Sequence, residues 1–402
     1  MSDRQTATRQ LVNPTTRQPG LPLDVASLRK AEFPWMVTSD EVFLNAASTG
    51  PLPQRAIDAV IEWTRLRATP HRLPDDMMFG MLAHARNLVA RLIGASPEEI
   101  ALAVNTGYGI NLAARALPLK AGDVVITPDL EFPANVYPWW AAANARGLEY
   151  RRIPLRDGAL DEDMLLAALD DRKVKCVSVS WVESANGNKV DLARIGRACR
   201  ERGIYFVVDA IQGLGASTLD VKHVPVDILA CGAQKWLLSP WGSGFVYVRD
   251  ELVRTLEPPI VSWMAPKGTD DFRRLRDYDM TWRDDARRFE FITVPFQDFA
   301  GMNASLELFF ELGVDRVAAH IEGLAAEIVR WAQSSGAVQL ITPASPSRRS
   351  GIVCVRPRDG LRASEALKAA GVIHSFREGN IRLAPHIYNT ADEVRSALAL
   401  MS

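Results

Sequence analysis

The sequence lacks the features that mark several specialised classes of protein. It has four cysteines in 402 residues and no C-x-x-C pair, so neither a disulfide framework nor a structural zinc site is expected. It has no run of about 18 apolar residues, which argues against a transmembrane helix. The six histidines form no H-E-x-x-H motif, so no metal site is predicted.

An excess of charge of one sign is also missing. The 47 lysines and arginines nearly balance the 48 aspartates and glutamates, which predicts neither a nucleic-acid partner nor an anionic membrane. Residues 1–22 are polar and have no apolar core, which excludes a secretory signal and favours a flexible arm. The scattered cysteines favour a reduced, cytoplasmic protein. The length favours one large and one small domain.

The most informative stretch runs from residue 204 to residue 248. Its first part, 204–208, is apolar, which predicts a strand buried on both faces, and it ends in Asp209. A second apolar run leads through Gly232 to Lys235. Two opposite charges are therefore expected at the mouth of one parallel sheet. Burial of either charge is costly unless a partner or a cofactor uses it.

This pair of charges suits pyridoxal phosphate (PLP). PLP needs a lysine for a Schiff base and an acid that keeps its pyridine nitrogen protonated. Lys235 suits the Schiff base, Asp209 the ring nitrogen, and Gln212 could donate to the ring phenolate. Taken alone, these residues equally allow a strand-ending aspartate and a solvated lysine.

Two motifs in this stretch resemble the class V aminotransferase family of fold-type I PLP enzymes. They are Val207-Val-Asp-Ala-Ile-Gln-Gly-Leu-Gly and Gly232-Ala-Gln-Lys-Trp-Leu-Leu-Ser-Pro-Trp-Gly-Ser-Gly-Phe. The family includes cysteine desulfurases, kynureninases and isopenicillin N epimerase-like proteins. The resemblance implies an α/β fold with a large PLP-binding domain, 55–290, built on a mostly parallel sheet. It also implies a small α+β domain, 23–54 with 291–402, a homodimer and a small amino-acid substrate.

An anion site is expected where the strand predicted over 100–104 meets a small-residue loop, 105–111, which contains Gly107 and Gly109, and a helix predicted over 112–116. Backbone N–H groups and the positive end of the helix dipole meet at such a place, although an ordinary βα turn is the alternative. The resemblance places the PLP phosphate here and implies contacts from Thr106, Gly107 and Tyr108. Gln234 replaces the histidine of many relatives and can still hydrogen-bond a phosphate oxygen.

Two further cofactor contacts are implied by the resemblance. Phe132 follows a predicted strand and is expected to stack on the ring, where many relatives have a histidine. Phenylalanine cannot carry protons, which leaves the proton work to Lys235. Thr293 lies in a segment that resembles Arg-Phe-Glu-x-Gly-Thr, whose threonine reaches the phosphate of the neighbouring subunit. A surface threonine is the alternative, because Ile292 replaces the usual glycine.

Substrate contacts are expected from both ends of the sequence. Arg382 lies on a predicted short strand, and a guanidinium fork binds a carboxylate with two hydrogen bonds. The resemblance assigns it to the carboxylate of the substrate and adds Asn45 and Ser48 as contacts. For a polar contact to the ring, Ser184 and Asn186 are both candidates, and the sequence does not choose between them.

The sequence disfavours one reaction of the family and leaves others open. A desulfurase needs a cysteine on a mobile loop, but residues 373–379 contain none and Cys354 is predicted inside an apolar strand. Amino transfer is the first expectation, with epimerisation and β- or C–S lysis as alternatives. Epimerisation needs a second acid–base group, for which Tyr108, His374 and His386 are candidates. An inactive PLP-fold binding or regulatory protein remains a further alternative.

Overall fold

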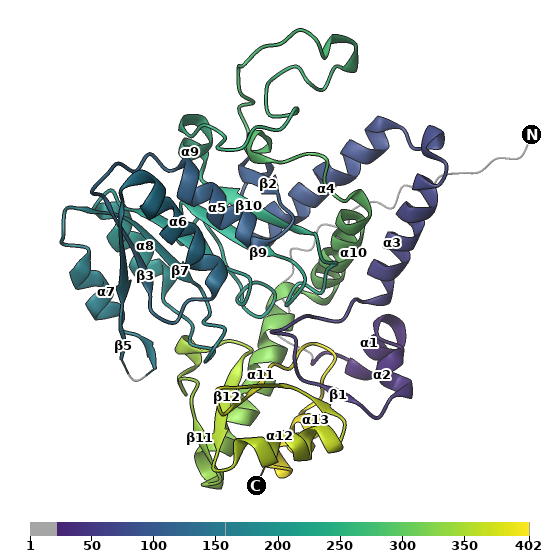
Figure 1. Ribbon diagram of the computed structural model, residues 1–402. Coiled ribbons are helices and arrows are strands. Elements are labelled where there is room, and N and C mark those ends of the chain that lie inside the picture. The colour runs from purple at the N-terminus through teal and green to yellow at the C-terminus, as the bar shows by residue number, and fades with distance from the viewer. Residues whose placement is uncertain (1–21, 157, 402) are drawn as a thin grey trace, which may run out of the picture.

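The computed structural model describes residues 22–156 and 158–401. The arm predicted over residues 1–22 therefore lies outside the described residues, apart from Pro22. The described chain forms a seven-stranded sheet, a four-stranded sheet and two small strand pairs, surrounded by helices (Figure 1). None of its helices is both long enough and apolar enough for a membrane span, a finding that covers the described residues.

The seven-stranded sheet forms the centre of the large domain. In sheet order its strands are β2 (Ile100–Leu102), β10 (Gly244–Val248), β9 (Ile228–Gly232), β8 (Tyr205–Asp209), β7 (Val174–Ser180), β3 (Val124–Pro128) and β4 (Glu149–Ile153). β10 runs antiparallel to both of its neighbours, and the other pairs are parallel. The expected α/β fold with a mostly parallel sheet is confirmed.

Helices cover both faces of this sheet, which explains why its strands are almost continuously apolar. They are α4 (Asp75–Ile93), α5 (Thr106–Ala116), α6 (Tyr137–Arg146), α7 (Glu162–Ala168), α8 (Leu192–Glu201), α9 (Asp250–Thr255) and α10 (Phe296–Leu312), and α3 (Gln54–Arg67) packs on α10. Successive strand residues pack into opposite cores. Phe206 and Val208 belong to the core with α4 and α8, whereas Val207 belongs to the core with α5 and α6.

Helix α5 begins six residues before the helix expected over 112–116. Asn105 caps it, because its side chain accepts a hydrogen bond from the amide of Tyr108. Gly109, which made this segment resemble a loop, lies inside the helix. A Cβ at Gly109 would lie 2.6 Å from the Cβ of Ala230, so glycine lets α5 approach β9 closely.

The small domain is built on an antiparallel sheet with the order β11 (Val338–Leu340), β12 (Val353–Pro357), β15 (Asn380–Leu383) and β14 (Ser375–Arg377). Helices α11 (Val314–Ser335), α12 (Gly360–Ala369) and α13 (Ala391–Ala399) pack on it. The N-terminal segment joins this domain, because β1 (Val42–Phe43) pairs with β13 (Val372–Ile373). Ahead of β1 lie α1 (Val25–Glu32) and α2 (Trp35–Thr38).

The division of the chain at residue 291 stays a prediction. Helix α10 follows that boundary, yet it packs against α3 and α4 of the large domain (Figure 1). A remaining strand pair, β5 (Leu155–Arg156) with β6 (Ala159–Leu160), lies at the margin of the large domain.

Candidate active site

Asp209 and Lys235 lie at the carboxyl ends of two neighbouring strands of the large sheet, near enough to interact electrostatically. Asp209 ends β8 and is 2% exposed, and its Oδ1 accepts a hydrogen bond of 3.0 Å from the amide of Ile211. Burial raises the pKa of Asp209 to about 6, against the opposing effects of the Ile211 amide and the charge of Lys235. Burial lowers the pKa of Lys235 to about 8, which Asp209 opposes and Arg382 reinforces. The two charges thus interact electrostatically, as their places at strand ends suggest.

Two further buried carboxyl groups lie near Asp209, and the sequence analysis missed both. Glu131 accepts hydrogen bonds of 2.5 Å from both the amide and the hydroxyl of Ser180, and burial raises its pKa to about 7. Glu183 is 0% exposed, and neither of its carboxyl oxygens has a hydrogen-bond partner among the described residues. Burial raises the pKa of Glu183 well above its usual value, with Glu131 and Asp209 adding to the effect. Burial therefore favours the protonated form of Glu183.

Phe132 lies beside the lysine. Its ring is 44% exposed, and the Nζ atom of Lys235 lies 5.5 Å from the ring centroid. An exposed aromatic face next to a half-buried lysine offers a flat cofactor a surface on which to stack. This is the place that the sequence analysis assigned to Phe132, and the role itself stays a prediction.

A small cradle lies where α5 begins. The hydroxyl of Thr106 accepts a 2.9 Å hydrogen bond from the amide of Gly232, which ties the start of α5 to the end of β9. A Cβ at Gly232 would lie 2.6 Å from the Oε1 of Gln234 and 3.3 Å from the Oγ1 of Thr106. The polar ends of these two side chains therefore converge on the bare backbone of Gly232. The hydroxyl of Thr106, the side-chain NH₂ of Gln234 and the backbone N–H groups at the start of α5 can all donate, and such a group of donors fits the phosphate of PLP.

Two residues with predicted cofactor contacts are engaged elsewhere. The hydroxyl of Tyr108 donates to the carbonyl of Phe289, and burial raises the pKa of Tyr108 to about 12. Gln212 donates to the carbonyl of Ala47 at 3.0 Å and accepts from the indole N–H of Trp236 at 2.8 Å. Both side chains join separate segments around the site, and their contacts with the cofactor stay predictions.

Arg382 is the centre of a polar network that unites the predicted substrate contacts. It is 3% exposed, and its Nη2 donates to the hydroxyls of Ser48 at 2.8 Å and Ser375 at 3.3 Å. Both serines lie within hydrogen-bond distance of the Oδ1 of Asn45, at 2.9 Å and 3.1 Å. The Nε of Arg382 has no partner in the described chain. The sequence analysis missed Ser375, because only the pairing of β14 with β15 reveals it.

The two candidates for a ring contact, Ser184 and Asn186, both lie in the loop after β7 and make different contacts there. The carbonyl of Ser184 accepts a 2.8 Å hydrogen bond from the Nη1 of Arg382, which places Ser184 at the site. Asn186 instead holds the loop together, through the carbonyl of Gly158 at 2.5 Å and the amide of Asn188 at 2.8 Å. A polar contact of either residue with the ring stays a prediction.

The three candidates for a second acid–base group are all engaged in structural contacts. Tyr108 is bonded as described above. His386 is buried, which lowers its pKa to about 3, and it hydrogen-bonds the carbonyl of Trp236 at 3.0 Å. His374 lies between the hydroxyl of Ser364 at 2.9 Å and the carbonyl of Val372 at 3.0 Å, inside the small domain. None of the three is a free base next to Lys235.

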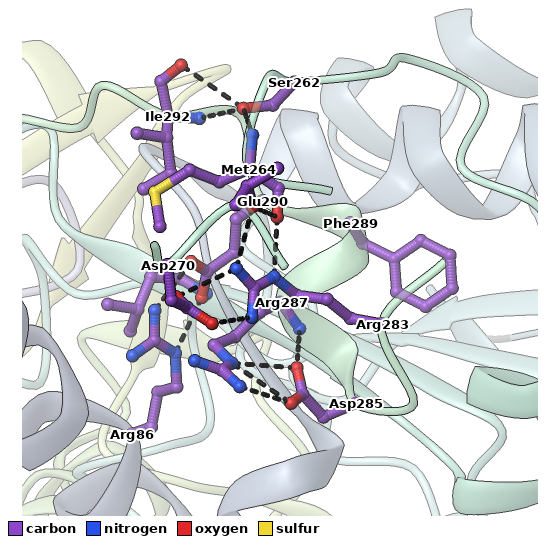
Figure 2. Close-up of polar contacts among 12 residues, drawn as sticks. Arg86, Ser262, Met264, Asp270, Arg283, Asp285, Arg287, Phe289, Glu290 and Ile292 are labelled. Atoms are coloured by element: carbon purple, nitrogen blue, oxygen red, sulfur yellow. Dashed lines mark hydrogen bonds and ion pairs between the residues drawn. The ribbon is translucent and has the colours of Figure 1, made fainter. Parts of the chain in front are cut away.

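The segment before Thr293 is fixed to the large domain by ion pairs. Figure 2 shows Glu290 held by the guanidinium of Arg86, at 2.8 Å and 2.6 Å, and Arg283 paired with Asp270. Thr293 follows this segment and is exposed. It lines a cavity of about 280 Å³ whose lining includes neither Lys235 nor Asp209. A role of Thr293 toward a neighbouring subunit stays a prediction.

The described residues include neither an exposed cysteine nor a cluster of metal-ligating side chains. All four cysteines are buried, and burial raises the pKa of Cys354, on β12, to about 12. A thiol with so high a pKa is a poor nucleophile at neutral pH. Within residues 22–156 and 158–401, no group of three His, Cys, Asp or Glu residues is arranged to hold a metal ion.

Comparison with known proteins gives a consistent result. The family model for class V aminotransferases matches residues 42–394. The chain is 32% identical over 314 residues to an uncharacterized aminotransferase, YcbU, of Bacillus subtilis. This alignment covers 78% of this chain and 81% of the relative. It is 29% identical over 388 residues to isopenicillin N epimerase of Streptomyces clavuligerus. This alignment covers 92% of this chain and 96% of the epimerase.

Solved structures share the fold. The apo structure of cysteine desulfurase from Thermococcus onnurineus matches with a TM-score of 0.82 at 23% identity, covering 94% of this chain and 96% of that one. The complex of the cystine C–S lyase C-DES with cysteine persulfide matches with a TM-score of 0.82 at 22% identity, covering 92% and 99%. At these identities the likeness concerns the fold alone.

Proposed function

This chain belongs to the class V aminotransferase family, and we propose that it transfers the amino group of an α-amino acid, with Lys235 as the acid–base group. Its cofactor is pyridoxal 5'-phosphate, which when bound supplies an electron sink for negative charge that develops at the substrate Cα. The residues around Lys235 must then bind and orient the amino acid and move one proton.

The observation that carries this proposal is the isolation of Lys235 as a base. Its pKa of about 8 gives the amine an appreciable neutral fraction near neutral pH, as proton abstraction requires. Phe132 cannot carry protons, and Tyr108, His374 and His386 are bonded elsewhere. Amino transfer would need a single base that takes a proton from the substrate Cα and delivers it, on the same face, to the cofactor carbon on the other side of the shared nitrogen.

The other residues of the site would bind and orient the cofactor and the amino acid. Asp209 accepts one hydrogen bond at Oδ1, and Oδ2 has no donor within the described chain, so it is free for the protonated ring nitrogen. Thr106, Gln234 and the start of α5 would hold the phosphate. Arg382, with its unpartnered Nε, would bind the carboxylate of the amino acid.

The test uses PLP-loaded protein with single amino acids and no 2-oxo acid acceptor. Amino transfer converts the bound cofactor lastingly to its aminated form and releases one equivalent of 2-oxo acid per site. Lys235→Ala abolishes both signals. Appearance of the opposite enantiomer, or of ammonia with an elimination product, while the cofactor returns to its starting form, would overturn the proposal.

Epimerisation is the second candidate, and it would need a second acid–base group besides Lys235. The similarity to isopenicillin N epimerase over nearly the whole chain favours it. Exchange of the substrate Cα hydrogen with solvent deuterium is expected for both reactions, but only epimerisation yields the opposite enantiomer without 2-oxo acid. A desulfurase is disfavoured, because burial leaves Cys354 inert.

We also propose a homodimer in which Thr293 contributes to the site of the partner. Sedimentation measures the assembly. Mixed dimers of Lys235→Ala and Thr293→Ala chains test the contribution. If each site takes Lys235 from its own chain and Thr293 from its partner, the site on the Thr293→Ala chain has both native residues. Regained activity on mixing supports a role across the interface. Activity no higher than that of the Thr293→Ala dimer contradicts it.

A further inference from the structure

We propose that Arg377 recognises a second carboxylate, so that the amino acid bound at this site is a dicarboxylic one such as aspartate or glutamate. This inference rests on the proposed function, since it extends the same site. The four-stranded sheet of the small domain carries Arg377 and Arg382 on two neighbouring strands, and the charges of both act on Lys235.

The strand register places Arg377 on the same face as Arg382. In the antiparallel pair β14–β15, Ser375 lies opposite Arg382 and Arg377 lies opposite Asn380. Residues two apart on a strand share a face, so Ser375 and Arg377 point the same way. Ser375 reaches Arg382 through a hydrogen bond, whereas Phe376 between them packs on the core of the small domain.

A third arginine extends this basic surface. Cys354 of β12 lies opposite Arg382, which puts Arg356 beside Asn380 on the same face. The Nε of Arg356 donates to the Oδ1 of Asn380 at 2.9 Å. Across the described residues, no carboxylate forms an ion pair with Arg356, Arg377 or Arg382. This face therefore carries positive charge that the protein itself does not neutralise.

Arg377 differs from Arg382 in what its side chain already binds. Arg382 is buried and held by Ser48, Ser375 and the carbonyl of Ser184. Arg377 is exposed and makes no hydrogen bond or ion pair with the described chain. Its charge nevertheless lowers the pKa of Lys235, as does that of Arg382, so both cations are near the reacting amine.

The spacing suits a short dicarboxylic acid. Diagonal neighbours on an antiparallel pair lie about 7–8 Å apart, a gap that long side chains can reduce. A substrate whose α-carboxylate binds Arg382 would direct a carboxylate at the end of a short side chain toward Arg377. Two anions would then balance the two cations beside Lys235. An arginine that is only solvated would add no such selectivity.

The test is first made on binding, independent of any reaction. Glutarate and pentanoate have equal chain lengths and differ by one carboxylate, and calorimetry measures their dissociation constants on PLP-loaded protein. We expect glutarate to bind at least about tenfold more tightly, because a charge-assisted hydrogen bond is gained. Arg377→Gln should remove this preference and leave pentanoate unchanged. Arg358→Gln, at another exposed arginine of the small domain, is the matched control.

Equal affinity of the native protein for the two acids would overturn the inference, as would a preference that survives in Arg377→Gln. Kinetics give a second readout. With glutamate, Arg377→Gln should raise KM about tenfold at unchanged kcat, whereas with norvaline neither should change. If no amino acid donates its amino group while the binding preference depends on Arg377, the proposed reaction fails and the assignment of Arg377 stands.

Discussion

The Nη2 of Arg382 donates a 2.8 Å hydrogen bond to the Oγ of Ser48, 334 positions earlier in the chain. Ser48 lies in the turn that follows β1, and Arg382 lies on β15. The Nη1 of the same guanidinium reaches the carbonyl of Ser184 in the large domain. The group proposed to bind the substrate carboxylate is thus held in place before any ligand arrives, which lowers the ordering cost of binding.

Ser48→Ala should weaken substrate binding through Arg382. The change removes one acceptor from a buried guanidinium, and hydrogen bonds to charged groups contribute about 1.5–3 kcal/mol. We expect KM for the amino acid to rise about tenfold with kcat little changed, measured in steady state. Ser334→Ala, on the exposed part of α11, should change neither constant. An unaltered KM in Ser48→Ala would show that Arg382 does not need this partner.

Gly50→Ala should displace the segment that carries Lys235. The Gly50 amide donates to the carbonyl of Gln234 at 2.9 Å, and a Cβ at Gly50 would lie 2.2 Å from the carbonyl oxygen of Lys235. Such overpacking against the backbone costs about 1–3 kcal/mol, and we expect PLP occupancy to fall with it.

Gly80→Ala provides the matched comparison for that substitution. Gly80 lies inside α4, and no atom lies within 4 Å of the added Cβ. Alanine should therefore raise the free energy of unfolding by about 0.5–1 kcal/mol. Chemical denaturation and cofactor absorbance measure both variants. Equal PLP occupancy in the two would contradict the close packing at Gly50.

The rate at which the apoprotein attaches PLP should rise with pH and level off above about pH 8. Only the neutral amine of Lys235 can attack, and burial lowers the pKa of Lys235 to about 8 from the usual value of a lysine. Asp209 raises this pKa, so Asp209→Asn should move the midpoint to lower pH. Stopped-flow absorbance measures the rate. A midpoint near that of a solvated lysine would refute the burial argument.

The pH dependence of stability should reveal the buried acid Glu183. Burial raises the pKa of Glu183 above its unfolded value, so the folded state binds more protons than the unfolded state. Its contribution is therefore fully present below the unfolded pKa, near 4.5, and is lost as pH rises through the folded pKa. Glu183→Gln should flatten the fall of Tm as pH rises above 4.5, whereas Glu365→Gln, at an exposed position, should not. Parallel curves would contradict the prediction.

Sequence alone predicted those site residues that stand in a recognisable pattern of neighbouring residues. Asp209 and Lys235 are charges at the ends of apolar runs, and the class V motifs around them led to Phe132, Thr106 and Arg382. The structure brings Asn45, Ser48 and Arg382 into one network, although it does not test the roles assigned to them.

Other features depend on tertiary contacts that no local pattern reveals. Ser375 joins the network only through strand register. Glu131 and Glu183 were missed because each is remarkable only for its burial beside Asp209. The glycines of 105–109 suggested a loop, whereas the helix starts at Thr106 and uses Gly109 to approach β9.

The hydrogen bonds of Arg382 have a consequence for the stability of the whole chain. They connect the N-terminal turn, the small sheet and the loop after β7, so a ligand that binds Arg382 stabilises the contacts between both domains. A ligand that binds only the folded protein adds about 2.7 kcal/mol at one hundred times its Kd. This free energy opposes separation of the domains as well as their unfolding. With Arg382 in its proposed role, substrate recognition and domain docking form a single linked equilibrium.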